Sequence, residues 1–393
     1  MKVIIIIGGL LILLPNIFNS KERRAFSNLT RMQLAKDSFE ISKLGDSVTV
    51  PVSGFYDKNA VHNFFYGKKY RKIWAEPVKM KVFDMDTVKG GMTALELGGG
   101  MQTIGLDLLS KDGKKFDMRS VNKDQSKALP KWLRITYLRM MFRDQVAAMN
   151  PYAALVVPSL ADAVGIDHAN PELYFVPYDE RMDSIYRSAM AGRVVILEKN
   201  LNSSWAGTGA YRNVSDFYDT EEMWEKVEAS DISIDTAYYL RCRLFDILIN
   251  DWDRHEGQWE WALLNMGDSS VFRSYPKDRD MAFYDFRGGW VNSIALLFNK
   301  KFQSFTPEYK NVKALTHNSG DLDEKLLSAV TLKQFLECAE NIAFQINDSV
   351  IASAFAQYPP EIYAMVGKKH EGILRARRDK LKDAAKKFYH ALH

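Results

Sequence analysis

Apolar and polar positions alternate in several short stretches of the first half of the chain. Valines at every second position within residues 46–52 are typical of a half-buried strand. Residues 93–97 predict another strand, and the turn pair Asp112-Gly113 precedes a third at 115–121. Two short apolar runs, at 173–176 and 194–197, predict two more strands. The first half of the chain is therefore expected to contain a β-sheet.

Helical periodicity dominates the rest of the chain. Apolar residues recur at helical spacing through residues 129–149, with Pro130 in the first turn. The basic tail, 360–393, is interpreted as a solvated amphipathic helix rather than a membrane- or nucleic-acid-binding element. The remaining predicted elements are helices at 153–164, 221–228 and 235–249 and from 306 onward, and strands at 259–264 and 271–275.

The N-terminus has the pattern of a targeting segment. Lys2 precedes an apolar run over residues 3–14, which is shorter than the roughly 20 residues that a spanning helix needs. We therefore expect residues 1–20 to be a signal peptide and the protein to be exported, to the periplasm or cell envelope. The alternative is a buried N-terminal strand. A loop rich in Gly, Ser and Asn at 201–220 is expected to divide the mature chain into 21–200 and 201–393.

Composition limits the classes of partner. A chain of 393 residues with 47% hydrophobic and 26% charged residues can bury one large core or two modest ones. Its formal net charge of +4 argues against nucleic acid as a partner. An aromatic and basic run at 56–76 would suit phosphate or single-stranded nucleic acid, but we favour rings packed on the core with cations in water. Cys242 and Cys338 form no metal-binding spacing, and we interpret both as buried apolar residues.

The densest chemistry lies in residues 251–261, where acids, Arg254, His255 and Gln258 follow an apolar run. A second acidic cluster, Asp278-Arg279-Asp280, comes after the next pair of strands and precedes further apolar residues. Acid-rich loops pinned between apolar segments indicate a metal–phosphate site rather than a solvated surface. The alternative is a network of Asp–Arg salt bridges that caps a helix.

Three consecutive glycines, Gly98, Gly99 and Gly100, follow the strand at 93–97. Without Cβ atoms, their backbone N–H groups can turn toward a ligand, a geometry that cradles phosphate. A flexible turn is the simpler alternative. The strand at 115–121 favours the phosphate interpretation, because it delivers Arg119 and then Lys123 toward the place where phosphates would lie.

The order of these features resembles the atypical protein- and lipid-kinase fold. Asp253-Arg254-His255, with Gln258 five residues after the Asp, is similar to the catalytic loop of HipA-like kinases, type II phosphatidylinositol 4-kinases and spore-coat CotH kinases. Those families carry Asn where Gln258 stands. Asp278-Arg279-Asp280-Met281-Ala282 is similar to their metal turn.

A second resemblance covers most of the chain. It is to a group of secreted Bacteroidetes proteins, some of them fused to metallophosphatase or outer-membrane barrel domains. The stretches that carry it are Gly98–Thr103, Arg119–Asp124, Asp251–Trp261 and Asp278–Phe283.

The resemblance implies an α+β, atypical protein-kinase-like, two-lobed fold, with a small, mainly β N-lobe within 21–200 and a mainly helical C-lobe within 201–393. It implies ATP or another nucleotide as cofactor, with Mg²⁺ or Mn²⁺, and an acceptor whose identity stays open. Asp253 would orient the acceptor hydroxyl and accept its proton, with His255 bracing the loop more readily than acting as a base.

The remaining roles also come from the resemblance. The metal would be held by Asp278 and Gln258, with Asp280 as the alternative ligand. Arg119 or Lys123 would neutralise the phosphates and pair with an acid from the helix at 129–149, where Asp144 is the candidate. The expected nucleotide-binding residues are Gly98, Gly99, Gly100, Gln102, Arg119, Lys123, Asp144 and Glu198.

Two other functions stay open on the same residues. The first is a catalytically inactive kinase-fold module that binds a ligand or scaffolds a partner in the envelope, since Gln258 departs from the family pattern. The second is a metal-dependent phosphoesterase, because clustered acids and a His also suit hydrolysis. Peripheral association with the envelope is compatible with each of the three.

Overall fold

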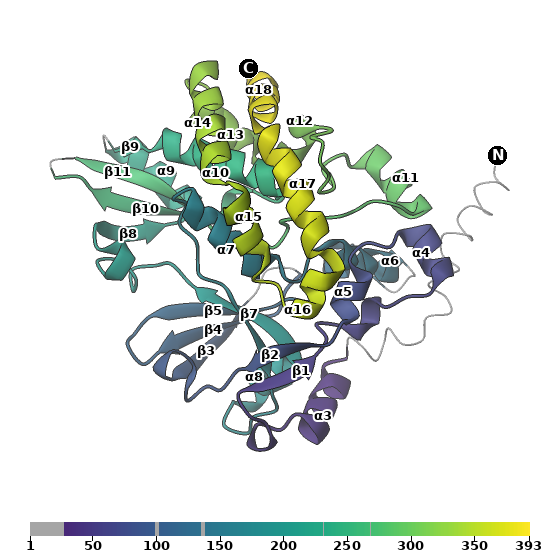
Figure 1. Ribbon diagram of the computed structural model, residues 1–393. Helices are drawn as coiled ribbons and strands as arrows, with labels where there is room; N and C mark the ends of the chain where they lie inside the picture. Colours follow the sequence, from purple (N-terminus) through teal and green to yellow (C-terminus); the bar gives the residue numbers. More distant parts are fainter. Residues whose placement is uncertain (1–26, 99–101, 135–137, 231, 268) are drawn as a thin grey trace. The chain divides into compact units, whose positions relative to one another are not determined.

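A computed structural model describes residues 27–393 apart from 99–101, 135–137, 231 and 268. The predicted signal peptide and two of the three glycines, Gly99 and Gly100, lie outside the described residues. The chain forms two compact units (Figure 1). Unit 1 comprises Met1–Pro151, Glu172–Glu198 and Asp285–Phe298, and unit 2 comprises Tyr152–Pro171, Lys199–Tyr284 and Asn299–His393. The chain thus crosses between units at 198/199, beside the expected division, and also at 151/152, 171/172, 284/285 and 298/299.

Unit 1 is built on a seven-stranded sheet with the strand order β1-β2-β6-β7-β5-β4-β3. Most neighbours are antiparallel, while β2 and β6 run parallel. In β2 the valines and methionine are buried and the two lysines are exposed, which is the burial that its alternating sequence predicts. The strands are β1 (Ser47–Val50), β2 (Val78–Val82), β3 (Met92–Gly98), β4 (Gly105–Ser110), β5 (Lys115–Ser120), β6 (Glu172–Val176) and β7 (Arg193–Lys199).

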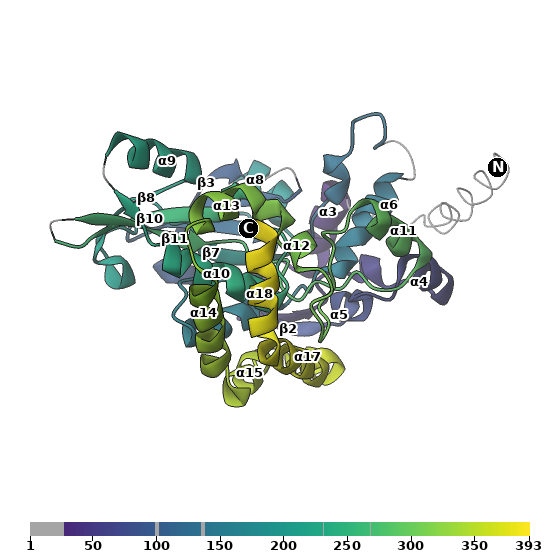
Figure 2. The same cartoon turned by 90° about the horizontal axis from the view of Figure 1, so that it is seen from above.

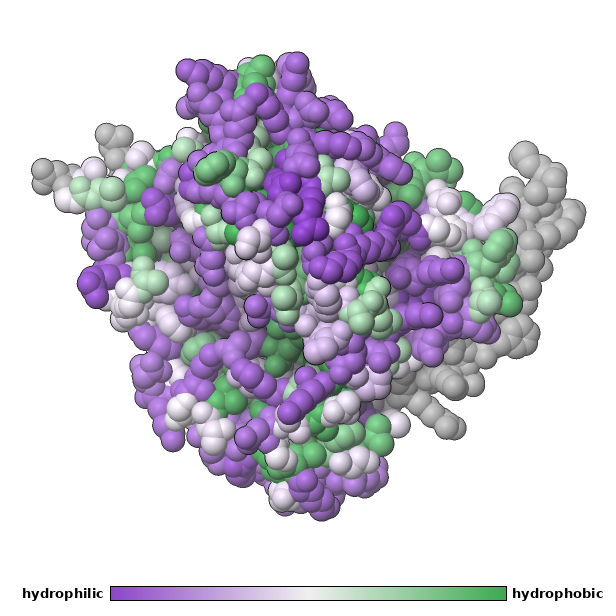
Figure 3. Space-filling model, viewed as in Figure 1, coloured by the Kyte–Doolittle hydropathy of each residue, from purple (hydrophilic) through white to green (hydrophobic). Residues whose placement is uncertain are grey.

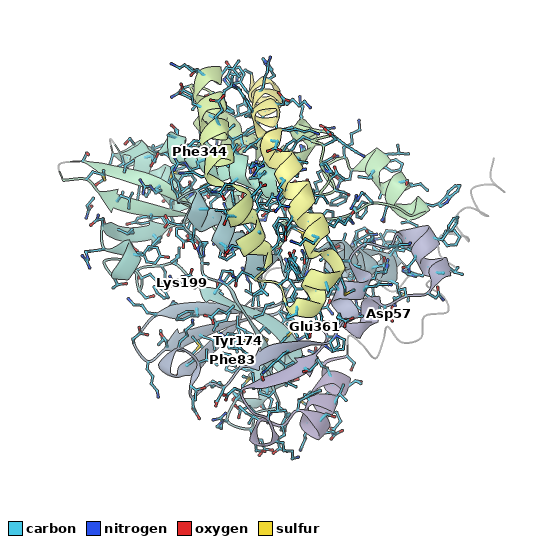
Figure 4. The ribbon with its side chains drawn as sticks, viewed as in Figure 1. Asp57, Phe83, Tyr174, Lys199, Phe344 and Glu361 are labelled. Atoms are coloured by element: carbon cyan, nitrogen blue, oxygen red, sulfur yellow. The ribbon has the colours of Figure 1, made fainter. Side chains whose placement is uncertain are left out.

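On the sheet, Phe83 and Tyr174 meet edge to face, with ring centroids 5.9 Å apart (Figure 4). Short helices complete unit 1. The α-helices are α3 (Asn28–Ser38), α4 (Ala60–Tyr66), α5 (Arg71–Ala75), α6 (Leu138–Asp144), α8 (Ser184–Met190) and α11 (Trp290–Phe298). The 3₁₀ turns are η1 (Ile41–Lys43), η2 (Gly54–Tyr56), η3 (Val88–Gly90), η4 (Gln125–Ala128) and η5 (Gln145–Ala148).

Unit 2 is organised around α10 (Thr236–Ile249), whose residues from Tyr238 onward are buried except Arg241. The Asp235 side chain caps its first turn by accepting the Tyr238 N–H, and Asn250 ends it in the left-handed conformation at φ 62°. A helix that is apolar on nearly all sides belongs in a core. Figures 1 and 2 show α14 and α18 side by side next to α10, in agreement with their contacts.

The other elements of unit 2 surround α10. A four-stranded sheet has the order β8-β10-β11-β9. Its strands are β8 (Val214–Tyr218), β9 (Ser233–Ile234), β10 (Trp259–Asn265) and β11 (Ser270–Pro276). The helices are α7 (Ala153–Ala163), α9 (Thr220–Ala229), α12 (Val312–Leu315), α13 (Gly320–Leu327), α14 (Leu332–Gln345), α15 (Asp348–Phe355), α16 (Pro360–Ile362), α17 (Lys368–Asp379) and α18 (Leu381–Leu392), with short turns η6 (Gly209–Tyr211), η7 (Glu256–Gln258), η8 (His317–Ser319) and η9 (Tyr363–Gly367).

The α+β class, with a sheet-based part and a mainly helical part, is confirmed. The basic tail is helical, with Leu381, Ala384 and Phe388 of α18 buried, as the amphipathic interpretation requires. The outer ends of α14 and α18 are hydrophilic in Figure 3. Among the described residues, no helix is both long and apolar enough to cross a membrane.

Two local predictions are wrong. The single helix predicted over 129–149 is broken, because α6 spans only 138–144 and η5 follows as a 3₁₀ turn. At the start of that range the Leu133 N–H binds the Pro130 carbonyl, three residues back, at 2.9 Å, and the Arg134 side chain takes the Leu129 carbonyl at 2.7 Å, which a regular helix would give to Leu133. The predicted loop at 201–220 contains β8, whose buried Val214 and Phe217 are surrounded by polar residues that conceal the strand pattern.

The core of unit 2 contains a buried ion pair that predicts a stability effect. Asp323 accepts from the Arg243 guanidinium at 2.7 and 3.0 Å and from the Tyr239 hydroxyl at 2.7 Å. Because Asp323→Ala leaves a buried guanidinium without this partner, we expect a loss of about 3–5 kcal/mol in the free energy of unfolding, measured by urea titration. Glu337→Ala, in an exposed pair with Lys333, is the control and should cost about 0.5 kcal/mol or less. Equal losses would contradict the assignment.

Candidate functional site

The first acidic loop starts where α10 ends. Because Asn250 adopts the left-handed conformation, the chain turns out of the helix, and the Asn250 side-chain amide fixes that turn by donating to the Gln303 carbonyl at 2.9 Å. Asp251 follows with its N–H bound to the Asp246 carbonyl at 2.9 Å. The loop then passes through the 3₁₀ turn η7 and enters β10 at Trp259. The loop is therefore anchored at both ends to the core of unit 2.

The β10–β11 hairpin brings the second acidic cluster back to the first. Trp259 at the start of β10 pairs with Pro276 at the end of β11. Beyond that pair, the Lys277 N–H donates to the Gln258 carbonyl at 3.1 Å. The turn at 278–280 must therefore begin beside the end of the first loop, although some 20 residues separate the two in sequence.

Arg254 joins the two loops from within. It is 1% exposed, and its guanidinium donates to the Lys277 carbonyl at 2.6 and 2.7 Å and to the Gln258 carbonyl at 2.8 Å. The guanidinium also lies 5.2 Å from the centroid of the Trp259 ring. One buried cation thus fixes the backbone of both loops, a role for which the rigid five-donor fork of Arg is suited.

Asp253 is held at its carboxylate by a residue that sequence reasoning missed. Its Oδ1 accepts from the side-chain amide of Asn318 at 2.7 Å, and the side-chain oxygen Oδ1 of Asn318 accepts from Lys301 Nζ at 3.2 Å. Ser319, the next residue, donates its hydroxyl to the Arg254 carbonyl. Asn318 and Ser319 lie in the 3₁₀ turn η8, far along the chain and in no motif, so only the fold could show their position.

Gln258 presents an atom that suits a ligand. His255 accepts the Gly257 N–H at Nδ1, at 3.1 Å, and its Nε2 lies 3.3 Å from the Gln258 amide nitrogen. The amide oxygen of Gln258 is buried and has no hydrogen-bond partner among the described residues. An unsatisfied buried carbonyl costs free energy unless something binds it. The contacts of His255, an exposed residue, are those of a local brace for η7.

The second loop holds Asp278 in a strained backbone conformation. Its φ of 57° is left-handed, which costs about 1 kcal/mol or more for a residue with a Cβ. Strain of this kind persists only where the surroundings impose it, and it is common at ligand-binding sites. The neighbouring Arg279 is buried and donates to Asp246 at 3.0 Å, which anchors the turn between Asp278 and Asp280.

The acids of the two loops share one electrostatic environment. Burial is the main cause that raises the pKa of Asp251 to about 7; the charge of Arg254 opposes the shift, and the charges of Asp246, Asp280 and Asp253 add to it. Asp251 is 2% exposed, and its Oδ2 lies 3.6 Å from Arg254. Because Asp253 and Asp280 belong to different loops, their shared influence on Asp251 places both acidic clusters at one site.

The donors at this site fit a magnesium ion held partly by phosphate. Among the described residues, no group of three or more His, Cys, Asp and Glu side chains is arranged to hold a metal. Mg²⁺ in phosphoryl-transfer sites takes one or two carboxylates, substrate phosphates and water. The orphaned amide oxygen of Gln258 and the carboxylate of Asp278 are oxygen donors of that kind.

The predicted nucleotide residues lie in unit 1. Gly98 ends β3 and pairs with Gly105, so the glycine turn does connect two antiparallel strands. A Cβ on Gly98 would lie 2.9 Å from Asp107 Oδ1, so a larger residue here would require the Asp107 side chain to shift. The backbone carbonyl of Gln102 accepts the Asp124 N–H at 2.8 Å.

Arg119, Glu198 and Asp144, all predicted for the nucleotide site, fall into two separate ion-pair sets. Arg119 at the end of β5 is paired with Glu198 at the end of β7. The carboxylate of Asp144, which was expected to pair with Arg119 or Lys123, accepts from Arg71 at 2.6 Å through both oxygens.

The Asp144 set is deeply buried. His62 and Lys69 also contact its carboxylate, at 2.9 and 3.3 Å. Burial opposes its ionisation, but the charges of Arg71 and Lys69 hold the pKa of Asp144 well below its usual range. The acid that the structure brings to Arg119 is Glu198, and Lys123 lies half-buried in the segment after β5.

Comparison with known proteins gives a distant structural likeness. No family model matches the chain, and no curated protein matches it in sequence. Among solved structures, the chain is similar to the proinflammatory kinase CtkA of Helicobacter pylori, at 11% identity and a TM-score of 0.34. The match covers 73% of this chain and 94% of that chain.

The raised pKa of Asp251 predicts how stability depends on pH. The folded state binds its proton up to about pH 7, whereas an unfolded Asp releases it near pH 4, so stability falls as pH rises between these values. The loss is about 1.4 kcal/mol for each unit between the two pKa values. Asp251→Asn should remove this dependence, measured as unfolding free energy at pH 5 and pH 8. The exposed Asp321→Asn is the control and should keep it. An unchanged pH dependence in Asp251→Asn would contradict the assignment.

Proposed function

We propose that the protein is a metal-dependent, kinase-like phosphotransferase that moves phosphate from a nucleotide to a hydroxyl acceptor in the cell envelope. The observation that carries the proposal is the joining of the two acidic loops through buried Arg254, which donates to backbone carbonyls in both. Phosphoryl transfer depends on positioned charges more than on covalent chemistry, so it needs acids and oxygen donors fixed in this way.

Asp253 is proposed to orient the acceptor hydroxyl and to take its proton as the new O–P bond forms. It is half-buried, so its carboxylate can meet both the protein and a substrate. Asn318 holds one carboxylate oxygen at 2.7 Å, which fixes the side-chain rotamer. His255 braces the loop and takes no proton in this proposal.

Gln258 and Asp278, with Asp280 as the alternative, are proposed to hold Mg²⁺ or Mn²⁺. The bound metal would neutralise the charge of the nucleotide phosphates. The orphaned oxygen of Gln258 supports this assignment, since a buried oxygen without a partner is costly. The left-handed backbone of Asp278 is a conformation common at ligand-binding sites.

The nucleotide, ATP or a relative of it, is proposed to contact unit 1 at the glycine turn, with Gln102 following the glycines. Arg119 or Lys123 would face the phosphates, and Glu198 orients Arg119. Asp144 is assigned a supporting role instead, because its carboxylate is saturated by Arg71, Lys69 and His62 in a buried cluster. The signal peptide, and with it an exported location, stays part of the proposal.

A phosphoesterase is less well supported by the same site. Two-metal hydrolases hold their ions with several His and carboxylate side chains. Within the described part of the chain, no three such side chains gather in that way. An inactive binding module would keep nucleotide binding and lose transfer, so the two experiments below separate it from an enzyme.

Nucleotide binding is the first test. ATP with Mg²⁺ at about 100 times its dissociation constant should stabilise the folded protein by about 2.7 kcal/mol, seen as a rise in Tm. Asp278→Ala should abolish the rise by removing a metal ligand. Glu361→Ala, an exposed acid of unit 2 labelled in Figure 4, is the matched control and should keep it. If wild type shows no rise in Tm, the nucleotide assignment fails.

Turnover of ATP to ADP tests the role of Asp253. Asp253→Asn should lower kcat by about 10²–10⁴-fold while ATP with Mg²⁺ still raises Tm, because it removes the proton acceptor and leaves the metal ligands in place. Binding without turnover in the wild type itself, with any hydroxyl acceptor offered, would identify the inactive module instead.

Asn318 gives a finer test of the same geometry. Asn318→Asp replaces a donor with a second negative charge beside Asp253, so the acidic limb of the rate–pH profile should move to higher pH. Asn318→Ala should lower kcat by about tenfold with KM for ATP unchanged, because the carboxylate loses its orientation. Asn341→Ala, on the exposed face of α14, should change neither. An unmoved pH limb in Asn318→Asp would exclude Asn318 as a positioning residue.

A further inference from the structure

Helix α11 of unit 1 exposes most of its large apolar residues. Its buried residues include Asn292, which is 1% exposed, whereas Trp290, Leu297 and Phe298 are 62%, 75% and 87% exposed. Ile294, on the same stripe, is 41% exposed. A surface helix of a soluble protein normally buries its apolar stripe. The exposed stripe of α11 therefore indicates a surface that contacts another molecule.

The orientation of α11 on unit 1 is fixed by the fold. The Asn292 amide donates to the Tyr66 carbonyl at 3.0 Å and to the Gly288 carbonyl at 2.9 Å. A Cβ on Gly289, whose φ is 81°, would lie 2.4 Å from the Gly67 nitrogen, so only glycine permits this approach of α11 to the end of α4. The fold therefore fixes the exposure of the stripe, because rotating α11 about its axis would break the hydrogen bonds of the Asn292 amide.

Helix α4 extends the apolar surface. Its Val61 and Phe64 are each 61% exposed, and the Phe64 and Trp290 rings lie 6.5 Å apart. Figures 1 and 2 show α4 and α11 side by side, and Figure 3 shows hydrophobic residues over both of them. We call this surface the α4–α11 face; it consists of Val61, Phe64, Trp290, Ile294, Leu297 and Phe298. A contiguous apolar patch of this kind marks an interaction site.

Cations flank the face in the sequence. Neither helix contains a charged residue. Lys58 precedes α4 and exposed Lys68 follows it, while exposed Arg287 precedes α11. The neighbouring acids are Asp57 and Asp285, and Asp285 is paired with Arg287 at 2.5 Å. Trp, Phe and Leu in the centre with Lys and Arg at the margins is the pattern of a helix that lies in the surface of an anionic bilayer.

We propose that the α4–α11 face binds the surface of a membrane containing anionic lipid, with Trp290, Leu297 and Phe298 inserted at the headgroup boundary. A second copy of the chain is the less favoured occupant. In a two-fold dimer the face would meet itself and bring like charges at its margins together. The inference does not rest on the proposed phosphotransfer, because it uses none of the residues of unit 2.

The test is co-sedimentation of the full chain with vesicles. Phosphatidylcholine vesicles with about one-third phosphatidylglycerol should bind wild type, and binding should fall as salt rises. The double variant Leu297→Ser/Phe298→Ser should bind at least about tenfold more weakly, because two large apolar side chains no longer enter the bilayer. Phe344→Ser, which removes an 84% exposed Phe from α14 (Figure 4), should bind within about twofold of wild type. All variants share residues 1–26, so any contribution of that segment cancels.

Two readouts keep the proposal falsifiable. Trp290 emission, taken as the difference between wild type and Trp290→Phe, should shift to the blue on vesicle binding as the ring leaves water. Light scattering reports the state of association without vesicles. Equal vesicle binding by wild type and the double variant overturns the proposal. So does a wild-type dimer that the double variant turns into a monomer, because the face would then be a contact between copies.

Discussion

The buried guanidinium of Arg254 is the interaction on which the site depends. It donates to the backbone of both acidic loops, so neither loop can move without breaking charge-assisted hydrogen bonds worth about 1.5–3 kcal/mol each. Backbone carbonyls accept its hydrogen bonds, so Arg254 fixes the loops without a hydrogen bond to the carboxylate of Asp253 or Asp278. A hairpin alone would bring Gln258 and Lys277 together, but only a buried multidentate donor fixes their orientation.

Three energetically unfavourable features occur in the two loops that Arg254 joins. Asp251 is buried with a raised pKa, Asp278 has a left-handed backbone, and the Gln258 amide oxygen has no partner among the described residues. Each cost is small beside the stability of a domain, yet all three fall within one short span of structure. A concentration of unfavourable features that a ligand would relieve is typical of binding and catalytic sites.

Sequence patterns predicted most strands of the unit 1 sheet and the helix α10, because their alternation and apolar runs are strong. They predicted neither the strand β2 nor several short helices of unit 1, such as α8 and α11. What failed was governed by contacts that periodicity does not show: the Arg134 side chain takes the Leu129 carbonyl within the helix predicted over 129–149, and Asn318 reaches Asp253 from a distant 3₁₀ turn. The pairing of Arg119 with Glu198 was equally hidden, because it depends on β5 and β7 being neighbours in the sheet. The spacing of residues along the sequence does not reveal such contacts.

The central claim is that the two acidic loops together hold a metal–nucleotide complex, and electron paramagnetic resonance of Mn²⁺ tests it most directly. With ATP present, wild type should remove free Mn²⁺ from solution, and Asp253→Asn should do so equally, because Asp253 acts on the acceptor. Asp278→Ala and Gln258→Ala should leave more Mn²⁺ free, since each removes a ligand from a different loop. Binding that is unchanged by either of these two substitutions would contradict the account.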